Sequence, residues 1–187
     1  MRHVFAFFFK LFGWKVVGEV PQNMKKAVIT VCPHNSSKDF FVGLGARAVM
    51  NRNIGYIGKA ELFKPPFGFI FRWLGGTPVK RSKKNNMVAD YVETIKSADE
   101  LMFALAPEGT RKDVDKIKTG FYHIAHGAGI AIIRIGFDFA KKEVIIAEPF
   151  YTSGDFEKDM QVHYVPFFEK IYAPKSWVKN FKEGIFL

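Results

Sequence analysis

Apolar positions along this chain fall into two alternating patterns. The run AVITVC at residues 27–32 is rich in β-branched side chains and predicts a buried strand. The segment at residues 40–50 that follows has the composition of a helix. The same alternation continues, with strands expected at residues 54–58, 77–80, 101–106, 130–135 and 143–147 and helices at residues 67–74, 87–96 and 120–128, the last capped by Thr119. Strands separated by helices predict an α/β fold, with a central, mostly parallel or mixed sheet flanked by helices.

The last 40 residues lack this regular alternation. Pro149, Pro166 and Pro174 interrupt them, and they predict one helix at residues 155–164 followed by a loosely ordered tail. No linker rich in Pro, Gly or Ser divides the chain, and its 187 residues match one domain of roughly 100 to 200 residues. We therefore expect a single domain.

The first 15 residues, MRHVFAFFFKLFGWK, have the pattern of an amphipathic helix. At about 100° per residue, their apolar side chains cover one continuous arc beside a narrow basic face. The apolar run at residues 4–9 is short and no small-residue cleavage site follows it, which argues against a signal peptide. The pattern is typical of a helix that lies in the headgroup region of an anionic membrane. We expect an interfacial segment at residues 1–15 before a domain at residues 16–187; the alternative is a helix that packs on its own core.

Composition narrows the classes of protein. With 48% hydrophobic residues the chain is not disordered, and the single cysteine excludes an internal disulfide framework. No apolar run exceeds about seven residues, whereas a membrane-spanning helix needs about 20. The net charge of +10 suits an anionic partner: nucleic acid, a membrane surface or a phosphorylated substrate.

A histidine and an aspartate follow the first predicted strand. His34 and Asp39 are five positions apart in PHNSSKD. A carboxylate there can accept a hydrogen bond from one imidazole nitrogen and leave the other free as a base. The same loop also fits a capping box, in which Asp39, three positions after Ser36, only satisfies backbone N–H groups at the helix start. The spacing alone leaves both interpretations open.

Two further blocks carry candidate ligand-binding residues. Gly75 and Gly76 make the turn into a short strand that presents Lys80 and Arg81 near its end, where a guanidinium can bind phosphate with two hydrogen bonds. The sequence PEGTR at residues 107–111 follows a predicted buried strand, and α/β folds place their ligands at such turns. Taken singly, the first block is equally an exposed basic strand end and the second a polar surface turn.

In this order and spacing, the three blocks resemble the glycerolipid acyltransferase family typified by 1-acylglycerol-3-phosphate acyltransferases. The resemblance covers about residues 28–135. It implies that His34 and Asp39 act in catalysis. It also implies that the lysine of GKAELF and the residues of the other two blocks line the glycerol phosphate site, namely Lys59, Gly76, Arg81, Glu108, Gly109, Thr110 and Arg111.

Three positions depart from the family pattern. The residue before the first-block histidine is usually Asn but is Pro33, and the residue before the second-block arginine is usually acidic but is Lys80. The later block rich in Val and Pro reads GIAIIRIG at residues 129–136. These changes bear on the identity of the acyl acceptor and leave the chemistry expected of His34 and Asp39 untouched.

The implied reaction moves a fatty acyl group from a thioester to the hydroxyl of a lysophospholipid such as 1-acylglycerol-3-phosphate. A thioester is already activated, so the protein must position the hydroxyl, remove its proton and stabilise the developing oxyanion. His34 is then the general base and Asp39 orients it, while Glu108 binds glycerol hydroxyls. Backbone N–H groups near Phe40, at the helix start, are candidate oxyanion donors. The resemblance implies no metal and no bound cofactor, with acyl-CoA or acyl carrier protein as the donor.

Such substrates place the protein on the cytoplasmic face of the cell membrane, as a peripheral protein without a nucleic acid partner. Three alternatives remain open on the sequence. A lipid hydrolase would use Ser36 or Ser37, although neither lies in a Gly-x-Ser-x-Gly elbow. A catalytically silent lipid-binding relative would share the motifs. A nucleic-acid-binding module would use the basic stretches at residues 81–84 and 179–182.

Overall fold

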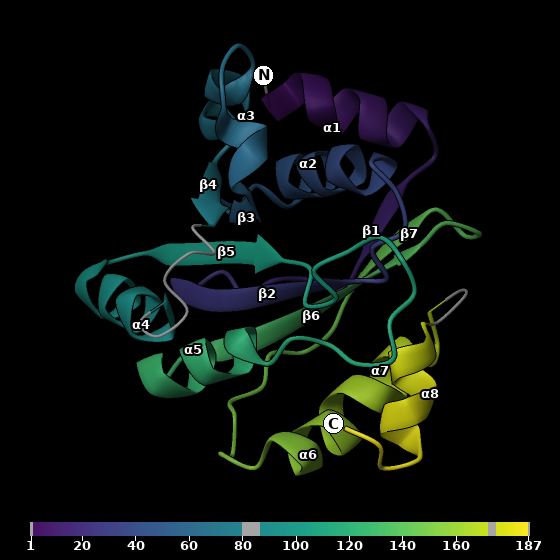
Figure 1. The fold of residues 1–187 in the computed structure, drawn as a ribbon. Helices are drawn as coiled ribbons and strands as arrows, with labels where there is room; N and C mark the ends of the chain where they lie inside the picture. Colours follow the sequence, from purple (N-terminus) through teal and green to yellow (C-terminus); the bar gives the residue numbers. More distant parts are fainter. Residues whose placement is uncertain (1, 80–86, 172–174, 187) are drawn as a thin grey trace.

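The computed structural model describes residues 2–79, 87–171 and 175–186 (Figure 1). Within these residues a seven-stranded sheet has the order β1-β7-β6-β2-β5-β3-β4. Neighbouring strands run parallel, except that β6 and β7 are antiparallel. The expected α/β domain with a mostly parallel, mixed sheet is confirmed. The strands are β1 (Lys15–Val17), β2 (Lys26–Cys32), β3 (Gly55–Lys59), β4 (Gly76–Val79), β5 (Leu101–Leu105), β6 (Ala131–Asp138) and β7 (Glu143–Ile146).

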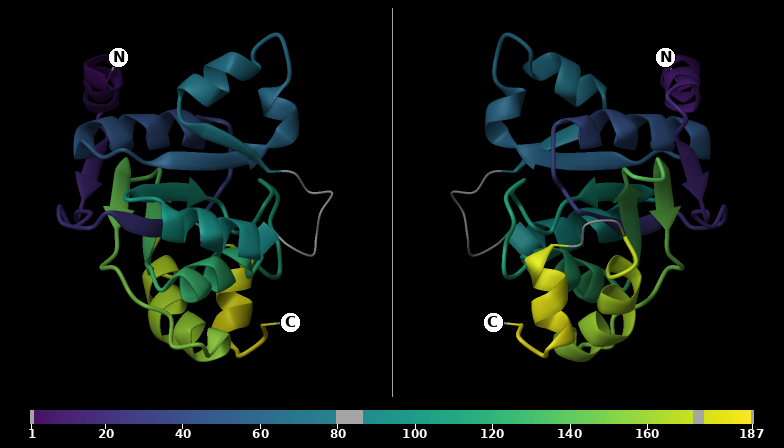
Figure 2. Two further views of the ribbon diagram at one scale, coloured as in Figure 1. Left: turned by 90° about the vertical axis from the view of Figure 1, so that its left-hand side faces the viewer. Right: turned by 90° about the vertical axis from the view of Figure 1, so that its right-hand side faces the viewer.

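Helices cover both faces of the sheet (Figure 2). The α-helices are α1 (Arg2–Leu11), α2 (Lys38–Met50), α3 (Gly68–Trp73), α4 (Met87–Ser97), α5 (Gly120–Ala128), α6 (Phe156–Asp159), α7 (Val165–Phe168) and α8 (Ser176–Lys182). A 3-10 turn, η1 (Ala60–Phe63), follows β3, and a π-helical turn, η2 (Met160–Tyr164), joins α6 to α7. Between residues 26 and 146 each described strand and α-helix begins and ends within three residues of its expected position, whereas η1 was not predicted. Thr119 precedes α5 as expected, but its side chain makes no capping hydrogen bond.

The alternation of side chains along β2 divides the core into two clusters. Val28 lies in the cluster under α5 and the C-terminal helices, and its neighbour Ile29 lies in the cluster under α1 and α2. This is the two-residue period of a strand whose faces are both covered. β6 is buried at every position for the same reason. The sheet therefore has no face open to solvent at its centre.

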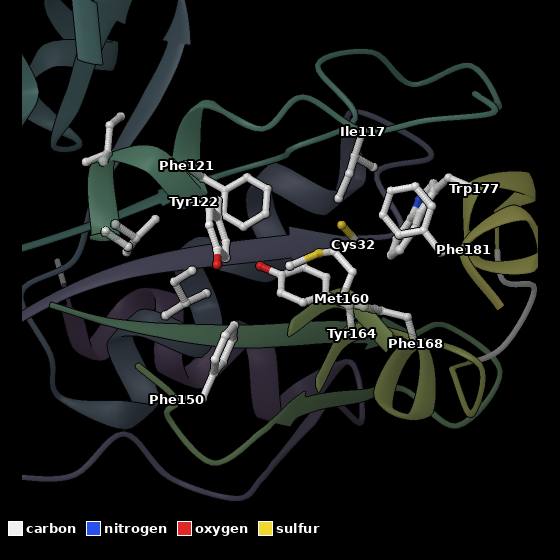
Figure 3. Close-up of a cluster of buried hydrophobic side chains, with 14 of the residues drawn as sticks. Cys32, Ile117, Phe121, Tyr122, Phe150, Met160, Tyr164, Phe168, Trp177 and Phe181 are labelled. Atoms are coloured by element: carbon white, nitrogen blue, oxygen red, sulfur yellow. The ribbon is translucent and has the colours of Figure 1, made fainter. Parts of the chain in front are cut away.

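The expectation of a loosely ordered tail is wrong. Residues 156–182 form α6, η2, α7 and, beyond the residues that the structure leaves undescribed, α8. Figure 3 shows Met160, Tyr164, Phe168, Trp177 and Phe181 gathered in one cluster beside Cys32, and each of these side chains is buried. Helical segments of four to seven residues are too short to show a hydrophobic period, so only their packing on the sheet identifies them.

The N-terminal segment is divided between a helix and the sheet. α1 ends at Leu11, and Lys15 begins β1, which pairs with β7 through Lys15 and Glu143. The sequence analysis missed this strand, because three residues at a sheet edge carry no detectable pattern. α1 packs on α2 through the buried side chain of Phe9, which lies against Gly45. No helix among the described residues is both long and apolar enough to cross a bilayer.

Parallel pairing brings the loops that carry the candidate residues to one edge of the sheet. Thr30, near the end of β2, pairs with Leu105, the last residue of β5. Lys59, the last residue of β3, pairs with Val79 at the end of β4. The loops that follow these strands therefore leave the same carboxyl edge, which is where α/β folds bind their ligands.

Candidate active site

His34, in the loop between β2 and α2, contacts Asp39 in the first turn of α2. The Nδ1 atom of His34 lies 2.8 Å from Oδ2 of Asp39. Asp39 is only 3% exposed, whereas the His34 side chain retains 28% of its exposure. Because Nδ1 faces the carboxylate, Nε2 is the ring nitrogen that can take up a proton from a substrate. The pair has the geometry expected of a base and its orienting group.

Asp39 also accepts hydrogen bonds from backbone N–H groups just before α2. Its Oδ2 accepts hydrogen bonds from the backbone N–H groups of Asn35 and Ser36, at 2.7 and 2.9 Å. The Ser36 hydroxyl donates to Oδ1 at 3.3 Å and accepts from the backbone N–H of Lys38 at 3.0 Å. The two interpretations of the sequence therefore hold together: Asp39 contacts His34 and satisfies backbone donors at the helix start.

The environment keeps Asp39 ionised. Burial raises its pKa, but the hydrogen bonds from His34 and from the backbone of Ser36 and Asn35 outweigh burial, and the pKa lies below the ordinary value of 3.8. An ionised carboxylate on Nδ1 fixes the tautomer of the imidazole. It also stabilises the cation that forms when Nε2 takes a proton.

Glu108 lies beneath the same loop, and its carboxylate faces the protein. Oε2 accepts the backbone N–H of His34 at 2.9 Å, and Oε1 accepts the indole N–H of Trp177 at 3.1 Å. The residue is 3% exposed, and burial raises its pKa although both hydrogen bonds and Lys175 oppose this shift. Both oxygens are thus engaged within the protein. The expected contact between Glu108 and glycerol hydroxyls stays a prediction, and in this structure Glu108 supports the backbone of His34.

Helix α8 holds the loop that follows Glu108. Lys175, just before the helix, and three residues of the helix form hydrogen bonds to four positions between residues 111 and 115. These bonds run from Lys175 Nζ to Arg111 O at 3.2 Å, from the Ser176 N–H to Asp113 Oδ1 at 2.9 Å, from the Trp177 N–H to Val114 O at 3.0 Å and from Asn180 Nδ2 to Asp115 O at 2.9 Å. The sequence analysis missed this role of residues 175–180, because no motif marks them.

The remaining residues of the PEGTR block shape the turn. Gly109 has a φ of +65°, a conformation that favours glycine, and its N–H donates to Ala106 O at 3.0 Å. The Thr110 hydroxyl accepts the backbone N–H of Lys112 at 3.2 Å. Arg111 is exposed, with its carbonyl held by Lys175. Its guanidinium is therefore available to an anion, while the backbone beneath it is fixed.

Lys59 and Gly76 lie at opposite edges of the sheet. Lys59 is exposed at the carboxyl edge, at the end of β3. Gly76 begins β4 and so lies at the opposite edge, where an added Cβ would come within 2.6 Å of the Tyr56 ring and 2.7 Å of Phe71 O. The structure thus assigns Gly76 to packing and does not bring it to His34. Arg81 lies outside the described residues.

The candidate oxyanion donors near Phe40 are engaged within the loop. The N–H of Phe40 donates to Ser37 O at 3.3 Å, and the N–H of Lys38 donates to the Ser36 hydroxyl at 3.0 Å.

A small hollow lies behind the loop, among Cys32, Pro33, Glu108, Phe168, Lys175, Trp177 and Val178. Cys32 is buried in it, and burial together with nearby Glu108 raises the pKa of its thiol well above the ordinary value. The thiol is therefore a neutral core side chain, as the strand pattern indicated.

Comparison with known proteins identifies the family of this chain. A family model described as acyltransferase matches residues 14–138. The chain belongs to the acyltransferase family. The matched region spans strands β1 to β6 and both candidate loops of this acyltransferase. It leaves out α1, β7 and the C-terminal helices, including α8.

The relatives with stated activities are acyltransferases of one kind. A 1-acyl-sn-glycerol-3-phosphate acyltransferase of Haemophilus influenzae is 29% identical over 138 residues, which cover 70% of this chain and 57% of that protein. The mouse 1-acyl-sn-glycerol-3-phosphate acyltransferase epsilon is 29% identical over 144 residues, covering 71% of this chain and 39% of the mouse protein. The chain thus aligns with only about two fifths to three fifths of the length of these relatives.

A solved structure shares the fold. The crystal structure of the 1-acyl-sn-glycerophosphate (LPA) acyltransferase PlsC from Thermotoga maritima matches with a TM-score of 0.60 and 21% sequence identity. The match covers 92% of this chain and 79% of that chain. The chain therefore shares its overall fold with that protein.

Proposed function

We propose that this protein transfers a fatty acyl group from an acyl thioester to the hydroxyl of a lysophospholipid such as 1-acylglycerol-3-phosphate. The observation that carries the proposal is the pair of His34 and buried Asp39, 2.8 Å apart at the carboxyl edge of an acyltransferase-family sheet. The named activity of both aligned relatives supports the substrate class.

The chemistry needs one base and no covalent enzyme intermediate. Nε2 of His34 takes the proton of the acceptor hydroxyl while the hydroxyl oxygen attacks the thioester carbonyl carbon. The new C–O bond gives a tetrahedral intermediate, whose C–S bond then breaks. The thiolate leaves and receives the proton from the imidazolium, so that atoms and charges balance. A general base of this kind contributes roughly 10² to 10⁴-fold in rate.

The acceptor phosphate binds at the cations of the carboxyl edge. Arg111 is exposed on a backbone that α8 fixes, and Lys59 is exposed at the end of β3. Arg81 of the second block completes this set in the proposal. A guanidinium binds phosphate oxygens with two hydrogen bonds, which makes the arginines the specific ligands and Lys59 a point charge. Acyl-CoA or acyl carrier protein supplies the acyl group.

The protein docks on an anionic membrane through α1, on the cytoplasmic face of the cell membrane. Phe9 packs on α2, but α1 and the residue after it carry a stripe of exposed apolar side chains: Val4, Phe7, Phe8, Leu11 and Phe12. Arg2, His3 and Lys10 are exposed on the same helix. An aromatic stripe with basic neighbours suits a lipid headgroup region. In this proposal residues 1–15 are the interfacial segment and residues 16–187 the acyltransferase domain.

The experiment that tests the function is product analysis. The purified chain is incubated with labelled acyl-CoA or acyl carrier protein and with vesicles that contain 1-acylglycerol-3-phosphate. We expect label in diacylglycerol phosphate, with no product when the acceptor is omitted. Label only in free fatty acid would identify a hydrolase, and intact donor with vesicle binding a silent relative. Either result would overturn the proposal.

A further inference from the structure

A second group of exposed aromatic side chains surrounds α3. Phe41, Phe67, Phe69 and Trp73 are each between 64% and 68% exposed. We call these four residues the α3 aromatic surface. Large aromatic side chains are rarely left in water together unless another apolar phase or molecule covers them. The proposed role of α1 does not account for these four, because they belong to α2 and α3 and their connections.

A layer of inner aromatic side chains supports the exposed ones. Beneath the surface, Phe40, Tyr56, Phe63 and Phe71 pack with ring centroids 5.1 to 6.5 Å apart. The Tyr56 hydroxyl donates to Phe71 O, and Arg72 Nη1 donates to Phe63 O, both at 2.9 Å. The inner aromatics fix α3, so the outer ones remain directed away from the domain.

The charges around the surface identify its partner. Lys59, Lys64 and Arg72 are exposed on the segment from β3 to α3, where Glu61 is the single acidic residue. Lys38 is exposed at the start of α2, beside Phe41. Aromatic side chains ringed by lysine and arginine match an anionic bilayer, in which the rings enter the apolar region and the cations contact phosphates.

The position of the surface relates it to the candidate active site. Phe41 is two residues after Asp39, and its neighbour Phe40 packs on Phe71 of α3 at 6.0 Å. The segment that carries Phe67, Phe69 and Trp73 begins at Lys59, on the carboxyl edge of the sheet. Figures 1 and 2 show α1 and α3 flanking α2 on one face of the sheet. The helices that carry the exposed stripe of α1 and the α3 aromatic surface therefore lie on the same side of the sheet, and Phe41 brings the α3 aromatic surface close to the His34 loop.

We propose that the α3 aromatic surface is a second membrane contact, which enters an anionic phospholipid bilayer beside the loop that carries His34. Two contacts define an orientation, whereas α1 alone would allow the domain to rotate about the helix. This orientation holds the acceptor site at the headgroup level, where a lysophospholipid presents its hydroxyl. The inference rests on the proposed function, because only a lipid-modifying enzyme needs its site held at a bilayer.

Tryptophan fluorescence tests the contact directly. In a Trp14→Phe chain the remaining tryptophans are Trp73, which is exposed, and Trp177, which is buried. With vesicles of phosphatidylglycerol and phosphatidylethanolamine brominated in the acyl chains, we expect strong quenching that disappears when Trp73→Phe is added. Vesicle binding without quenching of Trp73 would overturn the proposal, because α3 would then face away from the bilayer.

Vesicle affinity gives an independent measure with a matched control. We expect Phe69→Ser with Trp73→Ser to weaken binding to the same vesicles at least tenfold. Tyr151→Ser with Val162→Ser removes two comparably exposed apolar side chains, 68% and 57% exposed, near the C-terminal helices, and should leave binding unchanged. Equal affinity of the α3 variant and the unmodified chain would overturn the proposal. So would a dimer in solution that only the α3 variant dissociates, since the surface would then bind a second copy.

These binding measurements contain no acyl donor, so they separate the two claims. A chain that binds through Trp73 but forms no diacylglycerol phosphate would refute the proposed function and leave the membrane contact standing. A chain that transfers acyl groups while Trp73 stays unquenched would refute the membrane contact and leave the proposed function standing.

Discussion

At the scale of the residue, the Asp39 carboxylate contacts both the backbone of the loop and the imidazole of His34. It accepts hydrogen bonds from two backbone N–H groups of the loop and lies 2.8 Å from Nδ1 of His34, so the position of the imidazole ring and the start of α2 depend on one side chain. These hydrogen bonds are stronger to an ionised carboxylate than to the neutral acid. Its lowered pKa shows that the donors outweigh the cost of burial.

Asp39→Asn should lower both activity and stability. The amide presents one acceptor oxygen in place of two, so we expect a loss of about 1 to 3 kcal/mol in the free energy of unfolding near pH 7 and a large fall in turnover. Because the folded-state pKa of Asp39 lies below 3.8, its stabilisation is complete above that pH and is lost as the pH falls through the lowered pKa. Urea unfolding at about pH 7 and about pH 2 should therefore show a gap between the two proteins that closes in acid. A gap of equal size at both pH values would contradict the assignment.

Arg111 allows a test of the acceptor site. A charge-assisted hydrogen bond contributes about 1.5 to 3 kcal/mol, so Arg111→Ala should raise the KM for the lysophospholipid roughly ten- to hundredfold. The KM for the acyl donor should not change, and Arg111→Lys should restore only part of the loss, since the fork of donors is missing. Kinetics with each substrate varied in turn distinguish these effects. A change confined to the donor KM would exclude Arg111 from the acceptor site.

The sequence was sufficient for some of these residues. The spacing of His34 and Asp39 and the strand before them predicted their meeting, because one short loop separates the strand from the helix whose first turn carries Asp39. The role of Glu108 was out of reach. Its partner Trp177 is 69 positions away, and that contact depends on how the C-terminal helices pack on the sheet.

At the scale of the element, α8 is the support of the PEGTR loop. Its hydrogen bonds reach the loop at several positions, and Trp177 links it through Glu108 to the backbone of His34. The family match ends at residue 138, so this support is added by a part of the chain outside the matched region.

Trp177→Phe should reduce turnover more than it reduces stability. The phenyl ring keeps most of the packing but leaves a Glu108 oxygen without its donor, which frees the carboxylate to shift with the His34 loop. Tyr164→Phe is the matched control. It removes the hydroxyl that bonds Thr30 at 2.9 Å in the same layer, away from the loop. We expect both variants to lose about 1 kcal/mol of unfolding free energy but only Trp177→Phe to lower kcat, by about tenfold. Equal kcat values for the two variants would reduce Trp177 to a packing residue.

The C-terminal helices α7 and α8 could not be predicted from the pattern of apolar residues in the sequence. The segments between residues 26 and 146 were predictable because each strand or helix is long enough to show its period or its β-branched composition. α6, α7 and α8 span four, four and seven residues, and Trp177 and Phe181 become core residues only through contacts with distant elements. Tertiary packing, which has no local signal, determines this part of the fold.

At the scale of the whole molecule, the two faces of the sheet differ in their outer surface. The C-terminal layer packs its aromatic side chains inward, whereas α1 and α3 leave many of theirs exposed. The net charge of +10 adds attraction to an anionic surface. One side of the molecule is thus suited to a bilayer.

The stripe of α1 can be tested without disturbing the core. Phe9 is buried, so deleting the segment would uncover α2, whereas Phe7→Ser, Phe8→Ser and Phe12→Ser change only exposed side chains. If each ring contributes roughly 1 kcal/mol by partial insertion, the triple variant should bind anionic vesicles about a hundredfold more weakly. Added salt should reduce the binding of the unmodified chain only in part, because salt screens the lysines and arginines but not the rings. Undiminished sedimentation of a folded triple variant with vesicles would exclude α1 as an anchor.

The central claim is that His34 acts as the base in acyl transfer to a lysophospholipid, and one rate measurement tests it most directly. The formation of diacylglycerol phosphate is followed for the purified chain and for His34→Ala at saturating donor and acceptor, after circular dichroism has shown that both are folded. We expect the variant to be slower by at least about 10²-fold, because the loss of a general base alone accounts for that factor. A folded His34→Ala protein that retained near-normal turnover would contradict the account.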